Sequence, residues 1–159
     1  MSSNKIYNLA KELWPINRSI TGQGVRDTLS VIKNIHPDLR MYEVPSGSKV
    51  FDWVIPEEWN ITEAWIKTPD GRKICNFNNN NLHVVGYSES INKTLDLKEL
   101  NKHLHSIPSK PDAIPYITSY YKKRWGFCAS KNQLKNFKGS KFYVKIDSQF
   151  KNEHLSISE

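Results

Sequence analysis

The stretch from Leu13 to Leu29, which reads LWPINRSITGQGVRDTL, constrains the fold of this chain more than any other segment. Apolar residues at helical spacing lead into it, and Pro15 bars the residue before it from the helical region. A second apolar stripe opens at Thr21 or Gly22 and ends before His36-Pro37. The pattern predicts two helices within residues 4–35, the first capped by Ser3 and the pair joined by a tight connection.

Two glycines in this connection, Gly22 and Gly24, permit two interpretations. Glycine adopts backbone conformations that residues with a Cβ resist, which suits a tight turn between helices. The same glycines would leave backbone amides exposed at a helix N-terminus, where an anion can bind. Two glycines two residues apart are a weak signal for an anion site, so the helix–helix connection is favoured.

Beyond Val44 the chain has the pattern of short strands separated by turn residues. Strands are expected at 40–44, 50–55, 61–68, 72–77, 82–88 and 141–147. Pro69-Asp70-Gly71 is expected to close a hairpin, because proline and glycine suit successive turn positions. Helices are expected at 95–105, capped by Asp96, and at 132–137. His154–Ser158 reads as a strand returning after a hairpin turn, and its open edge fits a truncated domain as well as an ordinary C-terminal strand.

The composition is that of a polar chain without a membrane span. Its 159 residues are 38% hydrophobic, and no apolar run approaches the length of a transmembrane helix. The two cysteines, Cys75 and Cys128, form neither a metal-site spacing nor a disulfide framework. A reducing cytoplasm is therefore the expected location, with no membrane partner.

The net charge of +7 is concentrated in one region of the chain. Between Tyr120 and Lys145 there are basic residues and no acidic ones. Such a patch could attract nucleic acid or an anionic glycan, face an acidic segment, or be a solvated surface. No recognition motif accompanies the charge, so nucleic acid is not favoured. The candidate polyanion patch comprises Lys122, Lys123, Arg124, Lys131, Lys135 and Lys138.

Several blocks of this sequence together resemble one protein family. These blocks are residues 13–26, 43–53, 56–61, 81–88, 103–105, 111–121 and 124–128. They resemble a bacterial family with an aminopeptidase-like domain, whose members are often labelled as uncharacterised or as polysaccharide-biosynthesis proteins. The resemblance covers essentially the whole chain, although the chains of the family are considerably longer.

The resemblance implies an α/β architecture like that of co-catalytic zinc aminopeptidases. On this basis residues 1–44 and 130–159, the N-terminal helices and last strands, form an incomplete aminopeptidase-like domain. Residues 45–129 form a small β-rich inserted domain, and a winged helix lies at the far C-terminus of the family. The change of pattern after Val44 agrees with this division.

The resemblance also implies that the longer protein is a metal-dependent hydrolase of amide bonds in peptides or in a surface-polysaccharide pathway. The metal motif of the family lies beyond the point that matches Glu159. Zinc is therefore expected in the longer protein, whereas this chain alone is expected to hold no cofactor and no catalytic or metal-ligating residue. The missing catalytic segment is the expected partner, and the isolated chain is expected to self-associate or to be marginally stable.

An insert placed over an active site often lends side chains to the substrate pocket. The candidates for this role are Arg18, His105, Tyr120 and Arg124. Each also has a purely structural interpretation, such as a helix-end contact for Arg18. His103 with His105 is too small a set for a hydrolytic zinc site, and nothing orients His105 as a base for Cys128. The alternative function is a non-catalytic binding module for an anionic glycan, a nucleic acid or a partner chain.

Overall fold

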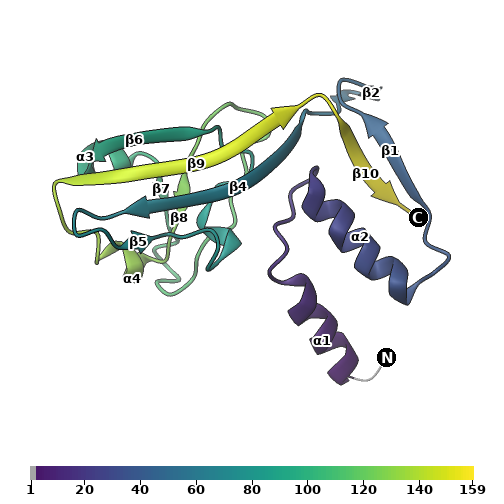
Figure 1. Ribbon diagram of the computed structural model, residues 1–159, viewed down its shortest axis with the longest axis horizontal. Helices are drawn as coiled ribbons and strands as arrows, with labels where there is room; N and C mark the ends of the chain where they lie inside the picture. Colours follow the sequence, from purple (N-terminus) through teal and green to yellow (C-terminus); the bar gives the residue numbers. More distant parts are fainter. Residues whose placement is uncertain (1–2) are drawn as a thin grey trace. The chain divides into compact units, whose positions relative to one another are not determined.

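The computed structural model describes residues 3–159 (Figure 1), which form two compact units of mixed helix and strand. The first unit consists of the described residues up to Asn60 together with Phe150–Glu159, and the second consists of Ile61–Gln149. The boundaries drawn from the sequence, 44/45 and 129/130, do not coincide with these units. The assignment of residues 1–44, 45–129 and 130–159 to domains of a longer protein stays a prediction.

The two predicted N-terminal helices are confirmed as α1 (Ser3–Leu13) and α2 (Gln23–Ile35). The glycines between them are required by close backbone packing. A Cβ on Gly24 would lie 1.8 Å from the carbonyl oxygen of Asn17, and one on Gly22 would lie 2.4 Å from that of Trp59. Gly22 also has a φ of 100°, a conformation that residues with a Cβ rarely adopt. The favoured interpretation, a tight helix–helix connection, is therefore confirmed.

The anion-binding interpretation of these glycines is not supported, because a side chain of the same unit takes that position. The backbone amide of Gln23, the first residue of α2, donates to Asn60 Oδ1 at 2.9 Å. One of the unpaired amides at the helix start is thus satisfied internally.

Glu58 is the polar centre of the first unit. Its side chain is 1% exposed and accepts two hydrogen bonds from the Arg26 guanidinium, at 2.6 and 2.9 Å. Asn60 Nδ2 donates to the same carboxylate at 2.8 Å, and the backbone of His154 adds a further bond. These hydrogen bonds, led by that of Arg26, lower the pKa of Glu58 to about 2 against the opposing effect of burial. The carboxylate therefore joins α2 and β10 (His154–Ser158) to the start of β4 (Glu58–Lys67).

Two strand pairs of the first unit differ from the expected pattern. β10 (His154–Ser158) pairs antiparallel with β1 (Met41–Pro45), so it does not return beside residues 141–147 as predicted. The single strand expected at 50–55 is wrong: β2 (Lys49–Val50) and β3 (Trp53–Val54) form a hairpin. Phe51 at its tip has a φ of 56°. Because phenylalanine does not favour this conformation, no residue at this position signals a turn.

A four-stranded sheet in the order β5-β4-β9-β6 forms the frame of the second unit (Figure 1). β5 (Lys73–Ile74) pairs antiparallel with β4 through the predicted turn at Pro69-Asp70-Gly71, which confirms that hairpin. β9 (Lys141–Lys151) contains the strand predicted at 141–147 and lies between β4 and β6 (Ile91–Asp96). Neither β6 nor its antiparallel pairing with β9 was predicted.

The core of the second unit lies against one face of this sheet. Phe142, Val144 and Ile146 alternate along β9 and are at most 1% exposed, as expected for side chains that share one face of a strand. Leu100 from α3 (Leu97–Asn101) and Phe127 from β8 (Phe127–Cys128) pack into the same cluster. β8 pairs in parallel with β7 (Leu104–His105), and α4 (Lys131–Leu134) follows.

Two other predictions for this unit are wrong in part. The helix expected at 95–105 is limited to α3, because Leu95 belongs to β6 and pairs with Phe142. The predicted cap is confirmed: the backbone amide of Glu99 donates a hydrogen bond of 2.8 Å to Asp96 Oδ1. The strand expected at 82–88 begins instead as a short 3-10 helix, Asn81–His83. Asn80 Oδ1 accepts from the amide of Leu82, and such a local side-chain bond competes with strand pairing.

Substitution of Glu58 by Gln should destabilise the first unit. Breaking a buried ion pair costs roughly 3–5 kcal/mol, and because Arg26 is 23% exposed we expect a loss of roughly 2–3 kcal/mol in the free energy of unfolding. Denaturant unfolding at pH 7 measures this loss. Because the pKa of Glu58 is lowered from 4.5 to about 2, its contribution is complete above pH 4.5 and disappears as the pH falls toward 2.

Glu63 provides the matched control for that measurement. It binds Lys145 at 2.6 Å, but its side chain is 31% exposed, and exposed ion pairs contribute little. Glu63→Gln should therefore lower stability less than Glu58→Gln. Equal losses for the two variants would contradict the central position of Glu58.

Substitution of Gly24 by Ala should be more damaging than the same change at Gly47. The new methyl group at residue 24 would overlap the Asn17 backbone, whereas no atom lies within 4 Å of a Cβ at Gly47. Gly47→Ala meets only the penalty of its positive φ, roughly 1 kcal/mol. We expect Gly24→Ala to cost about 2 kcal/mol or more by denaturant unfolding, and a smaller loss than at Gly47 would refute this packing argument.

Candidate functional site

The loop that precedes β8 lines an open pocket of about 280 Å³ within the second unit. Two of the four pocket residues proposed from the sequence, Tyr120 and Arg124, line it, as does the patch residue Lys122. No carboxylate is among its lining residues. The full lining is Thr118, Ser119, Tyr120, Tyr121, Lys122 and Arg124.

Gly86 holds this loop against the rest of the unit. Its amide donates to the carbonyl of Ile117 at 2.8 Å, and its carbonyl accepts from the amide of Ser119 at 2.9 Å. A Cβ on Gly86 would lie 3.3 Å from Thr118 Oγ1, which is tighter than an ordinary contact. The absence of a side chain therefore allows the two backbones to approach closely enough for both hydrogen bonds.

Aromatic rings form one wall of the pocket. The ring of Tyr120 lies 5.8 Å from that of Tyr87, edge to face, and 4.5 Å from that of Tyr121. Tyr87 is 3% exposed, whereas Tyr121 is 77% exposed, so Tyr120 links a buried ring to a solvent-facing one. Such a wall offers flat apolar surface to a ligand that enters from solvent.

Two hydrogen bonds anchor Arg124 within the same unit. Its Nη2 donates to the carbonyl of Thr118 at 3.1 Å, and its own carbonyl accepts from the amide of Glu89 at 3.0 Å. A guanidinium has five N–H donors, so this arrangement leaves donors for a carboxylate or phosphate.

His105 lies close enough to Arg124 for their charges to interact. Burial lowers the pKa of His105, and the positive charges of Arg124 and His103 lower it further. The imidazole is therefore held in its neutral form near neutral pH. The sequence placed His103 and His105 at a helix end, but His105 belongs to β7, and His103 stacks on Trp125 with ring centroids 3.7 Å apart.

Arg18, the fourth proposed pocket residue, belongs to the first unit. Its Nη1 donates to the carbonyl of Leu13 at 2.8 Å, at the C-terminus of α1, which is the structural alternative that the sequence left open. The structure thus brings Tyr120 and Arg124 to one pocket, with His105 interacting with Arg124. A substrate-binding role for the four residues stays a prediction.

The candidate polyanion patch is divided among several elements of the second unit. Lys122 to Arg124 lie on the pocket loop, Lys131 begins α4, and Lys135 caps its end. Lys135 Nζ donates to Asn132 Oδ1 at 2.7 Å. Lys138 instead lines a second and larger pocket, of about 440 Å³, beside β5. This pocket was not predicted, because its asparagine-rich loop has the pattern of an ordinary polar connection.

Both cysteines are buried thiols. Burial raises the pKa of Cys75 and of Cys128 to about 12, and Cys128 is 0% exposed. Because the thiolate is the reactive form, neither cysteine is equipped as a nucleophile near neutral pH.

Residues 3–159 contain no group of three or more His, Cys, Asp or Glu side chains that could hold a metal ion. A hydrolytic zinc site needs about three such ligands, so the described residues do not fit one by themselves. We assign no chemical step to a metal on this chain.

Within the same residues, no helix has the length and apolar character needed to cross a bilayer.

The model of the family described as "Domain of unknown function (DUF2172)" matches residues 58–149, which are more than half of the chain and include the whole second unit. The chain belongs to this family.

The individual relatives extend the likeness to the first unit. A Clostridium acetobutylicum protein named "Putative polysaccharide biosynthesis protein with aminopeptidase-like domain" is 46% identical over 158 residues, which cover 99% of this chain and 36% of that protein. The crystal structure of a "putative peptidase" from the same organism superposes with a TM-score of 0.93 at 46% identity, covering 98% of this chain and 36% of the other. The chain thus spans about a third of the length of these relatives and matches the N-terminal part. The resemblance inferred from the sequence blocks is confirmed.

Removing the charge of Arg124 should raise the pKa of His105. The positive guanidinium disfavours protonation of the imidazole, so Arg124→Gln removes one of the three causes that lower this pKa. An NMR titration of the His105 ring in both proteins measures the change. Lys123 is a neighbouring cation that is not among those causes. Lys123→Gln therefore serves as the control and should leave the pKa of His105 unchanged. An unchanged titration in Arg124→Gln would show that the two side chains do not interact.

Proposed function

We propose that this chain is the N-terminal portion of an aminopeptidase-like hydrolase that cleaves amide bonds in a peptide or a surface-polysaccharide pathway substrate. The observation that carries the proposal is the 46% identity over 158 residues to a protein named for an aminopeptidase-like domain. The superposition on a structure titled as a peptidase supports the same assignment.

In this proposal zinc is the metal of the longer protein, and its ligands lie outside the described residues. When bound, zinc would activate water and polarise the amide carbonyl. The present chain would supply scaffold and substrate recognition. In particular, Arg124 would bind a substrate carboxylate through its remaining guanidinium donors, and Tyr120 would pack against the adjacent part of the substrate.

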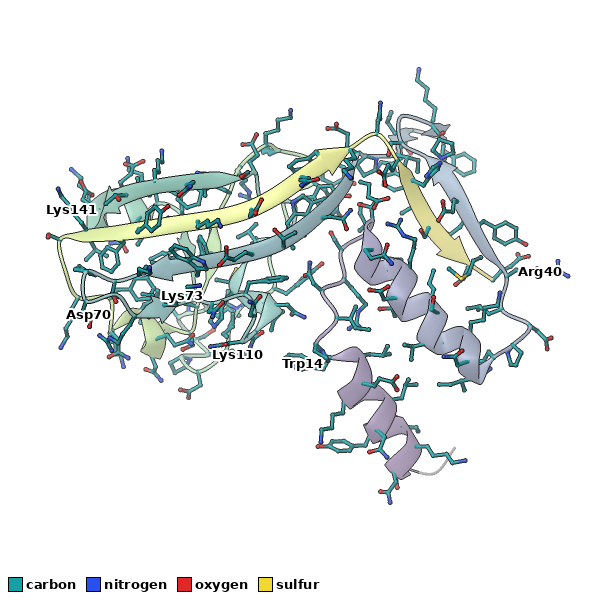
Figure 2. All side chains as sticks on the ribbon, viewed as in Figure 1. Trp14, Arg40, Asp70, Lys73, Lys110 and Lys141 are labelled. Carbon is teal, nitrogen blue, oxygen red and sulfur yellow. The ribbon has the colours of Figure 1, made fainter. Side chains whose placement is uncertain are left out.

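The surface of the first unit agrees with a role as scaffold for a further segment. Its buried apolar side chains among the described residues are Ile55 and Trp59, and neither α1 nor α2 buries a residue. Ile6 in α1 is 57% exposed, and Trp14, the residue directly after α1, is 56% exposed. Figure 2 shows Trp14 at the end of this helix. Short helices are marginal in water without packing, so we propose that the rest of the longer protein covers these faces. In the isolated chain the same faces would favour self-association.

Comparison of residues 1–159 with a longer product that includes the remaining part of the aminopeptidase-like protein tests the proposal. The longer product should bind zinc, measured by elemental analysis, and should hydrolyse members of a panel of aminoacyl amides. Residues 1–159 alone should do neither. Zinc in stoichiometric amount with hydrolysis from residues 1–159 would overturn the placement of the ligands. A longer product that hydrolyses no amide would contradict the proposal that the longer protein is an amide hydrolase.

The same assay separates a recognition role for Arg124 from a structural one. Arg124→Gln in the longer product should raise KM several-fold for substrates that carry a carboxylate and change KM little for their neutral analogues, because only the charged group uses the guanidinium. Lys123→Gln is the control for charge alone. An equal rise in KM for charged and neutral substrates would assign Arg124 to loop structure.

A further inference from the structure

We propose that the larger pocket of the second unit binds a small sugar that carries one anionic group, a carboxylate or a phosphate. The pocket has a volume of about 440 Å³, within the range of roughly 300–1,000 Å³ that is common for small-molecule sites. It is formed by β5, the asparagine-rich loop that follows, and α4 with the segment after it. All of its lining residues belong to the second unit, so the inference does not depend on the hydrolase proposed above.

The charged residues that line the pocket are all basic. Arg72, Lys73 and Lys138 line it, and no carboxylate does. Arg72 binds Asp70 at 2.7 Å and Lys73 binds Glu63 at 3.3 Å, both in exposed pairs that are weak and exchangeable. Lys138 takes part in none of the ion pairs found among residues 3–159. This lining selects an anionic group and disfavours a cation.

The side-chain amides of the pocket are oriented by their own hydrogen bonds. Asn76 Oδ1 accepts from the amide of Asn78 at 3.2 Å, and Gln133 Oε1 accepts from the amide of Ser130 at 2.8 Å. In each residue the oxygen is therefore used within the protein and the NH₂ group is left to donate. Donors of this kind suit the hydroxyl and carboxylate oxygens of a sugar.

His83 supplies the complementary acceptor. Its side chain is buried, with Nδ1 2.8 Å from the carbonyl oxygen of Cys128. A carbonyl can only accept, so Nδ1 carries the proton and Nε2 is the accepting nitrogen of the ring. Burial also lowers the pKa of His83, which keeps the ring neutral. A ligand hydroxyl that enters the pocket can donate to Nε2.

Apolar surface completes the lining and argues for a ring rather than a bare ion. Phe137, 8% exposed, and Ile74 are both among the lining residues. Amide donors, one neutral imidazole acceptor, cations and an apolar contact together match a polyhydroxylated ring with a single negative charge. An inorganic anion would use only the cations, and an uncharged sugar would use only the amides, His83 and the apolar surface.

Titration of the ¹⁵N-labelled chain by NMR tests this site. The probes are glucuronate, glucose 6-phosphate, uncharged glucose and inorganic phosphate. Saturable shifts should occur at residues 72–83 and 133–138 with at least one of the two charged sugars, and glucose and phosphate should bind at least five-fold more weakly. The tighter of the two charged sugars identifies the anionic group. Absence of saturable shifts, or equal binding of glucose, would overturn the proposal.

Lys138→Gln and Lys135→Gln separate a defined site from diffuse attraction. Both lysines are exposed, and both changes remove one positive charge, but only Lys138 lines the pocket. Lys138→Gln should weaken binding of the charged sugar about five-fold, equivalent to about 1 kcal/mol, and Lys135→Gln should leave it unchanged. Equal weakening by the two variants would show that net charge alone attracts the ligand and would refute the site.

Discussion

The bidentate ion pair between Arg26 and Glu58 is the interaction on which the arrangement of the first unit depends. The Glu58 carboxylate is removed from solvent and is compensated by hydrogen bonds from three residues, which belong to α2, β4 and β10. The first unit has few buried apolar side chains, so its packing provides little alternative support. A polar centre of this kind demands close positioning of its partners, because an unpaired buried charge is far more costly than a lost apolar contact.

Local signals in the sequence predicted the elements that are set by local chemistry. Pro15 and the glycines after it defined the two helices, and Pro69 to Gly71 defined the hairpin. The elements that were missed depend on distant partners. β6 has one buried residue, Leu95, and is a strand because β9 pairs with it; the sequence around Leu95 resembles a helix equally well. The partner of β10 is β1, more than a hundred residues earlier in the chain, and periodicity contains no information on such a pairing.

The same distinction applies to the sites. Tyr120 and Arg124 are four residues apart in sequence, and the structure places both on one pocket. The Glu58 centre and the larger pocket combine segments that are far apart in the chain, such as residues 72–83 and 133–138. The sequence patterns of these segments were interpreted separately, as short strands, a polar loop and a short helix. Their chemical meaning arises only when the sheet brings them together, which a single sequence does not reveal.

The two buried cysteines make opening of the second unit measurable by thiol modification. Both lie within residues 61–149, both are protonated well above neutral pH, and Cys128 is sealed from solvent. A thiol reagent in excess at neutral pH would modify Cys128 only in molecules whose second unit has opened, since reaction needs an accessible thiolate. The rate of modification therefore reports how often the second unit opens. The first unit contains no cysteine, so its opening does not contribute to the measured rate.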